Sequence, residues 1–218
     1  MPAVFSLENE TIAYDGFTAL EQVSLTILPG EKVALIGKSG AGKTTLLRRL
    51  YQLRPSDSAF VHQHHALVPQ LSVFHNIYMG RLDRLSVLEN IRNLIHPSRA
   101  RLRQIRPIAA TLGLEGKLFE KTCALSGGQQ QRVGIGRAIY RGGEVLMADE
   151  PVSSLDRVRG EQIIRILTDT SKTVISSLHA VDFARRFFDR VIALGKRRVV
   201  FDLPADQVTD DRLRSLYG

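Results

Sequence analysis

The sequence has a single cysteine, no long apolar run, and no basic segment leading into an apolar one at its start. A lone cysteine, Cys123, excludes an internal disulfide and is typical of a reducing compartment. No run of about 18 apolar residues is present, so the sequence predicts no membrane-spanning helix. The opening MPAVFSLENE lacks the pattern of a signal peptide. Together these absences predict a cytoplasmic protein.

Acidic residues are scarcer than basic ones, and the formal net charge is +8. This balance predicts an anionic partner such as a nucleotide, a nucleic acid or a lipid surface. The basic side chains are densest between Arg81 and Arg106, yet no aromatic residue interleaves with them. A surface that stacks on bases needs such aromatics. We therefore interpret this zone as a solvated helical face and do not expect nucleic acid as a partner.

The pattern of apolar residues predicts an α/β fold within the 218 residues. Strand-type segments fill the first 35 residues, helices with breaks near Pro97 and Gly113 are expected over residues 72–121, and residues 205–217 are predicted to close the chain as a helix. The short apolar strands EVLMA, TVISSL and RVIAL alternate with helical segments. Such alternation indicates a largely parallel sheet with helices on both faces.

Residues 37–44, GKSGAGKT, match the phosphate-binding pattern G-x-x-x-x-G-K-[ST] between a strand and a helix. Backbone N–H groups of such a loop, together with the helix N-terminus, bind phosphate oxygens. Lys43 would reach the β- and γ-phosphates, and the Thr44 hydroxyl would ligate Mg²⁺. The expected ATP-binding residues of the loop are Gly37, Lys38, Ser39, Gly40, Ala41, Gly42, Lys43 and Thr44.

The apolar segment EVLMADE ends in two carboxylates, Asp149 and Glu150. In enzymes with a phosphate-binding loop, an acid at this place contacts Mg²⁺, a role that suits Asp149. Glu150 is then placed to polarise a water for attack on the γ-phosphate. Many buried strands end in acids without catalysis, and the interpretation depends on the phosphate loop about a hundred residues earlier.

The segment LSGGQQQR places Ser126, Gly127 and Gly128 at the start of a helix. A serine at this place can be an ordinary N-cap. An N-cap does not explain why a domain that binds one nucleotide has a second helix start suited to binding phosphate. GKSGAGKTT, LSGGQQQR and LMADEP followed by SSLD, in that order, resemble the nucleotide-binding subunits of ATP-binding cassette transporters. The resemblance covers essentially the whole chain.

This resemblance implies a RecA-like P-loop NTPase core with a reduced N-terminal antiparallel β subdomain and an inserted helical subdomain. The expected bounds are about 1–35 for the β subdomain, about 36–63 and 126–218 for the core, and about 64–125 for the helical subdomain. The family works as head-to-tail dimers in which each ATP lies between two subunits. Ser126, Gly127, Gly128 and Gln129 would then face the ATP of the partner subunit.

Five further residues take roles from the same resemblance. Tyr14 resembles the aromatic that stacks on adenine, although an ordinary strand tyrosine is the alternative. Thr45 resembles the second hydroxyl of the loop, and Gln63 the glutamine that contacts Mg²⁺ and the attacking water. Asp156 resembles the aspartate that communicates between the two ATP sites. His179 resembles the histidine that contacts the γ-phosphate, and we expect it in the catalytic set with Glu150, Gln63 and Lys43.

A narrower resemblance links NIYMGRL, LSGGQQQRVGIGRAI and ADEPVSSLD, with Val152, to the ATPases of phosphonate-type importers. It implies an ATP hydrolase, using ATP and Mg²⁺, that powers import of a phosphonate or related phosphorus oxyanion. The partners would be a second copy of the chain, a separate transmembrane permease and, indirectly, a periplasmic binding protein. The ATPase would lie peripherally on the inner face of the membrane. A non-transport ATPase, accessory or associated with nucleic acid, and an ATP-binding regulator without turnover are the alternatives.

Two features depart from the family pattern, and a histidine cluster lies beside one of them. Only twenty positions separate Lys43 from Gln63, about half the usual number, so a hairpin of the β subdomain should be missing. Gln63 is surrounded by His62, His64 and His65 in FVHQHHAL, which at first suggests a metal site. Neighbouring strand positions point to opposite faces, so three ligands would need help from elsewhere, and we interpret Gln63 as the functional residue. Packing, exposure to solvent and contact with a partner are the alternatives for the histidines. Gly134 and Gly136 lie in the helix after LSGGQ, where each costs about 1 kcal/mol relative to alanine.

Overall fold

The structure is a computed structural model that describes residues 2–14, 16–63, 66–170 and 173–218. The chain divides into two compact units, Met1–Phe60 with Gly143–Gly218, and Val61–Gly142. Each unit is described by itself below. The predicted subdomain bounds remain predictions, and the helix that follows LSGGQ lies in the second unit.

A six-stranded sheet in the order β4-β5-β6-β3-β7-β8 forms the centre of the first unit. Its strands are β3 (Lys32–Ile36), β4 (Ser58–Val61), β5 (Val145–Asp149), β6 (Thr173–Ser177), β7 (Arg190–Gly195) and β8 (Arg198–Pro204). The pairs β3–β6, β3–β7 and β5–β6 are parallel, and β7–β8 is antiparallel. The prediction of a largely parallel sheet is confirmed. Strands β5 and β6 are buried along their whole length, as their continuous apolar runs require.

A separate antiparallel pair, β1 (Phe5–Tyr14) and β2 (Phe17–Ile27), precedes this sheet. Helix α1 (Lys43–Leu53) is followed after four residues by β4, which leaves no room for a hairpin between them. The reduced β subdomain predicted from the short Lys43–Gln63 interval is therefore confirmed. The described part of the β subdomain is a two-stranded sheet.

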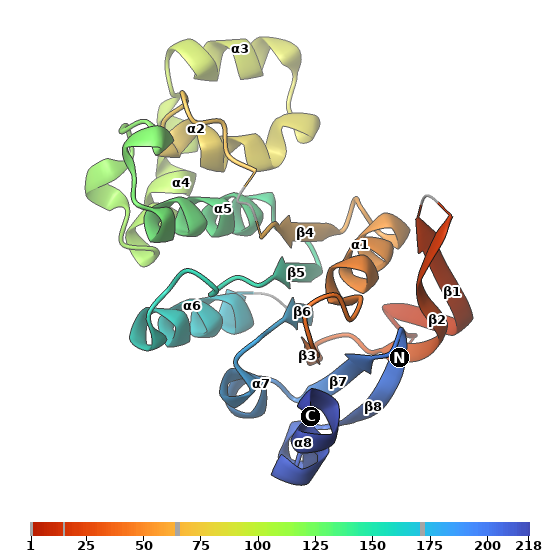
Figure 1. The fold of residues 1–218 in the computed structure, drawn as a ribbon. Helices are drawn as coiled ribbons and strands as arrows, with labels where there is room; N and C mark the ends of the chain where they lie inside the picture. Colours follow the sequence, from red (N-terminus) through yellow and green to blue (C-terminus); the bar gives the residue numbers. More distant parts are fainter. Residues whose placement is uncertain (1, 15, 64–65, 171–172) are drawn as a thin grey trace. The chain divides into compact units, whose positions relative to one another are not determined.

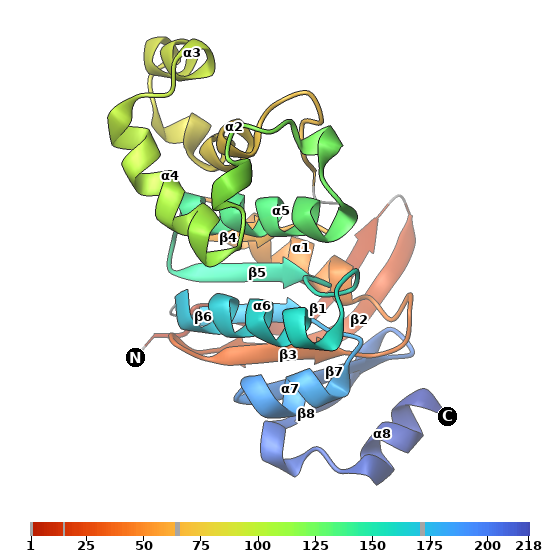
Figure 2. The ribbon, with the colours of Figure 1, turned by 90° about the vertical axis from the view of Figure 1, so that its left-hand side faces the viewer.

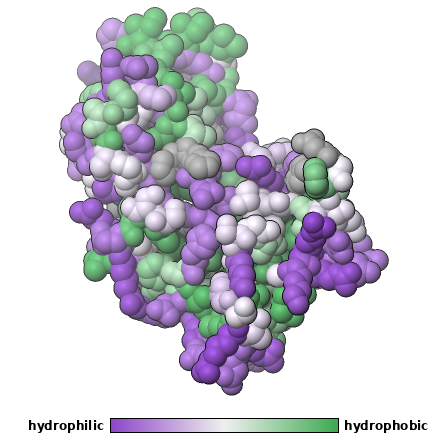
Figure 3. Space-filling model, in the orientation of Figure 1, coloured by the Kyte–Doolittle hydropathy of each residue, from purple (hydrophilic) through white to green (hydrophobic). Residues whose placement is uncertain are grey.

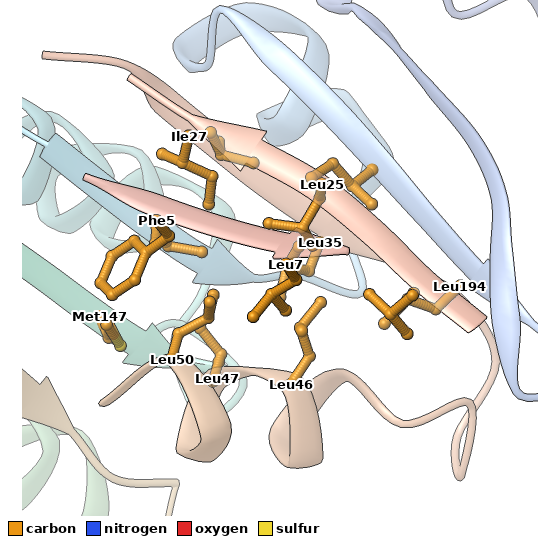
Figure 4. Packing of buried hydrophobic residues seen from close by; sticks show 14 of the residues in the cluster. Phe5, Leu7, Leu25, Ile27, Leu35, Leu46, Leu47, Leu50, Met147 and Leu194 are labelled. Atoms are coloured by element: carbon orange, nitrogen blue, oxygen red, sulfur yellow. The ribbon is translucent and has the colours of Figure 1, made fainter. Parts of the chain in front are cut away.

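Elements of the first unit cover both faces of the six-stranded sheet (Figures 1 and 2), and each face carries its own cluster of buried apolar residues. On one face, the strand pair β1–β2 packs with α1 around Leu35 and Met147 (Figure 4). On the other face, α6 (Arg157–Thr170) and α7 (Val181–Phe187) pack around Ile36 and Val191. A sheet covered on both faces holds the ends of its strands rigidly, and the predicted site residues lie at those ends.

The predicted closing helix is wrong in its first residues. Ala205–Gln207 form a short 3-10 turn, and α8 begins only at Asp210 and ends at Tyr217. Thr209 is the N-cap, and its hydroxyl accepts from the N–H of Arg212. A threonine cap has an extended backbone, which stops the helical pattern from continuing back to residue 205.

The second unit is helical. Its elements are α2 (Val73–Tyr78), η1 (Met79–Arg84), α3 (Val87–Ile95), α4 (Arg99–Thr111), η2 (Glu115–Lys117), η3 (Thr122–Ala124) and α5 (Gly127–Arg141). The predicted breaks near Pro97 and Gly113 are confirmed. No described helix is both long enough and apolar enough to cross a membrane.

Asn76 is the polar hub of this unit and is fully buried. Its Nδ2 donates to the carbonyls of Val68, Leu71 and Ser72, while its Oδ1 accepts from the N–H of Val68. Nη2 of Arg137, on α5, also donates to Oδ1. One side chain thus anchors the loop before α2 to both α2 and α5.

Helix α3 has its polar side turned inward and its apolar side outward. Asn93 is 1% exposed, and Asn90 accepts from the hydroxyl of Tyr78 at 2.9 Å. The outward side carries five aliphatic residues that are 53–79% exposed: Val87, Leu88, Ile91, Leu94 and Ile95. Figure 3 shows hydrophobic side chains gathered over this helix. We call these five residues the α3 apolar face.

Four arginines of the basic zone, on α3 and α4, are exposed, as the interpretation of a solvated helical surface requires, whereas Arg81 is half-buried over the ring of Tyr140. Arg92 lies on α3, and Arg99, Arg103 and Arg106 follow on α4. Arg101 is different, because its guanidinium pairs with Glu89 at 2.6 Å and ties α4 to α3.

Candidate active site

The phosphate-binding loop joins β3 to α1 and has the backbone that its glycines allow. Gly37 has φ +147°, and a Cβ there would lie 2.2 Å from the carbonyl oxygen of Leu194. Gly42 has φ +99°, and a Cβ would meet the side chain of Leu20 at 2.6 Å. Both positions therefore require glycine, and the loop curls tightly in front of α1. Lys38, Ser39, Gly40 and Ala41, between them, line a cavity of about 680 Å³.

Lys43 is the first residue of α1 and is 5% exposed. Its Nζ donates to the carbonyl of Gly37 at 2.7 Å and to that of Lys38 at 3.2 Å. Burial lowers the pKa of Lys43 below its ordinary value of 10.5, and the carboxylates of Glu150 and Asp149 oppose this shift. The ammonium thus lies under the loop, near the two acids.

Asp149 ends β5 and is 3% exposed. Its Oδ1 accepts from the hydroxyl of Thr44 at 3.1 Å. A hydroxyl and a carboxylate oxygen side by side are ligands that Mg²⁺ prefers, and in such enzymes the substrate phosphates complete its coordination. The donor set therefore fits this ion. No group of three or more His, Cys, Asp or Glu residues lies together among the described residues as a separate metal site would require.

Glu150 follows directly and has φ +50°, a left-handed conformation that is rare for a residue with a side chain. Its Oε1 lies 2.6 Å from Nε2 of His179, which comes just after β6. The Glu150 side chain is 14% exposed and the His179 side chain is 53% exposed. Both line a cavity of about 380 Å³ together with Val152 and Ser153. The structure thus brings two predicted catalytic residues into contact at an open edge.

Ser177 is a site residue that the sequence analysis missed. It is fully buried at the end of β6, where it is the register partner of Asp149 on β5. Its hydroxyl donates to Oδ1 of Asp149 at 2.7 Å and accepts from the N–H of Glu150 at 2.9 Å. The available signal was position, because TVISSL and EVLMAD are parallel strands that end at the same edge of the sheet.

The remaining predicted residues of the first unit lie in three places. Thr45 is half-buried in the first turn of α1. Asp156 lies before α6, and its Oδ1 accepts from the N–H of Arg159 at 3.0 Å, so it serves as a helix cap. Tyr14 is the last residue of β1, and its side chain lies outside the described part of the structure.

The second unit carries the other predicted residues. Ser126 and Gly127 are exposed at the start of α5, with Gly128 in the same first turn. The Gln129 side chain folds back and accepts from the N–H of Ser126 at 2.9 Å, which holds the helix start in shape. These residues therefore present a preformed helix N-terminus to solvent.

Gln63 is exposed two residues after β4, and His62 beside it is exposed as well. His64 and His65 lie outside the described residues. Gln63 and Ser126 belong to the second unit, whereas the phosphate loop belongs to the first. The roles of both residues at the ATP phosphates therefore remain predictions.

Gly136, in α5, lies where packing is close. A Cβ there would come within 3.0 Å of Cδ1 of Ile77 and 3.1 Å of Cδ1 of Leu112. These neighbours belong to the second unit and leave little room for a side chain at this position of the helix.

Comparisons with known proteins agree with this arrangement. Residues 20–153 match the family model described as ABC transporter. The phosphonates import ATP-binding protein PhnC of Maricaulis maris is 37% identical over 97% of this chain and 92% of that protein. The protein of the same name from Pseudomonas putida is also 37% identical, over 99% of this chain and 90% of its own length.

A solved structure of an ATP-binding cassette, a dimer in a post-hydrolysis state bound to ADP and Pi, is also similar. It is 28% identical, has a TM-score of 0.77, and the match covers 92% of this chain and 98% of that one. The RecA-like fold with a P-loop is thus shared with cassettes of known structure. Because the family model spans more than half of the sequence and full-length relatives exceed 30% identity, the chain belongs to the ABC transporter family, as an ATP-hydrolysing subunit.

Proposed function

We propose that this chain powers the import of a phosphonate or a related phosphorus oxyanion through a separate membrane permease. One observation carries the substrate class: relatives that match over nearly their whole length are named as phosphonates import ATP-binding proteins. The motifs of the phosphonate-type ATPases, including Val152 beside the candidate active site, support the same class.

In the proposed mechanism, the phosphate loop and Lys43 bind the phosphates of ATP, with Thr45 near the α-phosphate and Tyr14 against adenine. Thr44, Asp149 and Gln63 would hold Mg²⁺, which supplies positive charge to the phosphate oxygens when bound. Glu150 orients and polarises the attacking water, and the 2.6 Å contact with His179 holds its carboxylate toward the open edge. The buried Lys43 stabilises the charge that develops on the γ-phosphate.

The second half of each ATP site is proposed to come from another copy of the chain. Ser126, Gly127 and Gly128 begin a helix in the second unit, whereas the phosphate loop belongs to the first, and the exposure of Ser126 and Gly127 supports a role toward a partner's ATP. The similar cassette with ADP and Pi is a dimer, which supports a head-to-tail pair here. Asp156 would connect the two sites.

A membrane partner is supported by the α3 apolar face. Its five aliphatic side chains are exposed, because the polar side of the helix is bonded within the unit, and Ile91 and Leu94 also line a pocket with Tyr78. Exposed apolar patches of this kind mark interaction surfaces. We place a cytoplasmic segment of the permease on this face, which would hold the ATPase on the inner side of the membrane. A periplasmic binding protein would deliver the substrate to the other side.

Growth of the source organism on a phosphonate as the only phosphorus source tests the function. Deletion of the gene should abolish growth on the phosphonate and leave growth on inorganic phosphate unchanged. Wild-type protein should restore growth, whereas Glu150→Gln should not, because hydrolysis is lost. Phosphonate-dependent growth of the deletion strain would contradict the substrate class. Restoration by the Glu150→Gln protein would contradict coupling to hydrolysis.

A further inference from the structure

Ser177 links the two acids of the site, although neither its residue type nor its position in a motif indicates a role. We infer that Ser177 is a positioning residue that sets the backbone of Glu150 and the carboxylate of Asp149 for hydrolysis. The inference rests on the proposed function of those two acids. It assigns to β6 a part in the active site beyond carrying His179.

The register of the sheet places Ser177 between β5, which ends in Asp149, and β3, which leads into the phosphate loop. Ser177 is opposite Asp149 on β5 and opposite Leu35 on β3. Ser177 and its neighbour Ser176 are both fully buried, so water does not compete for their hydroxyls. A hydroxyl can donate one hydrogen bond and also accept one. The Ser177 hydroxyl does both: it donates to Asp149 and accepts from the N–H of Glu150, the next residue along the chain.

Each bond restrains a group that the chemistry needs in one place. Glu150 has φ +50°, and a residue with a side chain keeps this conformation only when its surroundings hold it. The bond from its N–H to Ser177 Oγ supplies such a restraint at 2.9 Å. Oδ1 of Asp149 accepts from Ser177 at 2.7 Å and from Thr44 at 3.1 Å, which restricts rotation of that carboxylate. Removal of the Ser177 hydroxyl takes this bond from the N–H of Glu150.

Ser176 is a matched control. It lies on the same strand with the same burial, but its hydroxyl donates to the carbonyl of Ser177 at 3.3 Å and to neither acid. Ser177→Ala and Ser176→Ala therefore remove the same atom from adjacent buried positions. Ser177→Thr keeps the hydroxyl and is the conservative variant.

The first measurement is steady-state ATP hydrolysis. Ser177→Ala should lower kcat about tenfold while the KM for ATP changes less than twofold, because positioning is lost and nucleotide binding is kept. Ser176→Ala should stay within twofold of wild type, and Ser177→Thr should recover most of the loss. Equal kcat values for Ser177→Ala and Ser176→Ala would overturn the inference.

The second measurement needs neither nucleotide nor turnover. Amide hydrogen exchange of the apoprotein should show the Glu150 N–H protected in wild type and exchanging about tenfold faster in Ser177→Ala. The Glu150 amide should be unchanged in Ser176→Ala. An unprotected Glu150 amide in wild type overturns the inference even if the alanine variant does not fold. If wild type itself does not hydrolyse ATP, the proposed function fails, whereas the exchange result still decides whether Ser177 holds Glu150.

Discussion

The strand ends of the first unit and the surface of α3 in the second unit treat polar groups in opposite ways. At the strand ends, Asp149 and Ser177 are buried and bonded to each other, and the buried Lys43 of α1 donates to a carbonyl of the phosphate loop. On α3, the polar groups are bonded inward and five aliphatic side chains face solvent. The first arrangement costs desolvation but holds reacting groups still. The second leaves apolar surface exposed, as interaction surfaces do.

This difference indicates that ATP hydrolysis and binding to another protein use separate parts of the chain. Hydrolysis requires groups held within a fraction of an ångström, which a sheet packed on both faces supplies. Coupling to another protein requires surface that the unit does not satisfy itself. Variants of the strand ends should therefore change turnover without changing association, and variants of α3 should do the reverse.

The largest expected effect is on hydrolysis. Glu150→Gln keeps the size of the side chain but removes the base, so turnover should fall about 10³-fold with ATP binding retained. Phosphate release and equilibrium binding of a fluorescent ATP analogue would measure the two quantities. Glu161→Gln removes a carboxylate that pairs with the surface arginines Arg165 on α6 and Arg186 on α7, and this variant should turn over normally. Turnover by Glu150→Gln near the wild-type rate would contradict the assignment of the base.

A large effect on stability is expected from Asn76→Ala. The substitution leaves an N–H and three carbonyls of the loop and α2 without their side-chain partner. The free energy of unfolding should fall by about 3 kcal/mol, because buried polar groups lose bonds that water does not replace. Denaturant unfolding would measure it, with Gln52→Ala, an exposed amide on α1, as the control. A loss equal to that of the control would mean that Asn76 is not the hub of the second unit.

Two glycines near α5 should respond differently to alanine. At Gly80 a Cβ would lie 2.4 Å from the backbone oxygen of Arg137, whereas at Gly136 it would meet only the side-chain ends of Ile77 and Leu112. Gly80→Ala should lower the free energy of unfolding by about 2 kcal/mol through overpacking. Gly136→Ala should change it by less than about 1 kcal/mol, since better helix propensity offsets tighter packing. The reverse order would contradict the packing described for this unit.

The smallest expected effect concerns the α3 apolar face. Leu88→Asp should weaken association with the permease about tenfold, because a charge would be desolvated in the interface. ATP hydrolysis by the isolated subunit should stay unchanged. Val158→Asp is the matched control, since Val158 is 70% exposed on α6 and Leu88 is 79% exposed on α3. Co-purification of each variant with the membrane complex would measure the effect, and equal retention of both would exclude this face as the docking surface.

Much of the fold was predictable because local signals agreed with the global arrangement. The buried strands are continuous apolar runs, and the breaks at Pro97 and Gly113 follow from the chemistry of those residues. The missing hairpin followed from counting residues between Lys43 and Gln63. The start of the closing helix was not predicted, because Thr209 reads equally well as a helical residue and as a cap until its hydroxyl is placed.

The candidate site was predictable in its motifs but not in its contacts. The phosphate loop, Asp149, Glu150 and His179 were recognisable because each comes at the end of a strand in a known order. The contact between Glu150 and His179, and the two bonds of Ser177, join residues that are 27–29 positions apart. The register between β5 and β6 decides which of these residues lie opposite each other. That register cannot be predicted from the residues of either strand alone.

The sequence by itself determined the loop that binds phosphate, the order of the strands and helices along the chain, and membership in a family of ATPases. Spacing and residue type are enough for these, because they depend on neighbours along the backbone. Only the tertiary structure decided that Ser177 bridges two acids and that α3 turns its aliphatic side outward. The same apolar period at 87, 88, 91, 94 and 95 would suit an inward face equally well. The hydrogen bonds of Asn90 and Asn93 turn the polar side of the helix toward its unit, and the apolar side is left exposed.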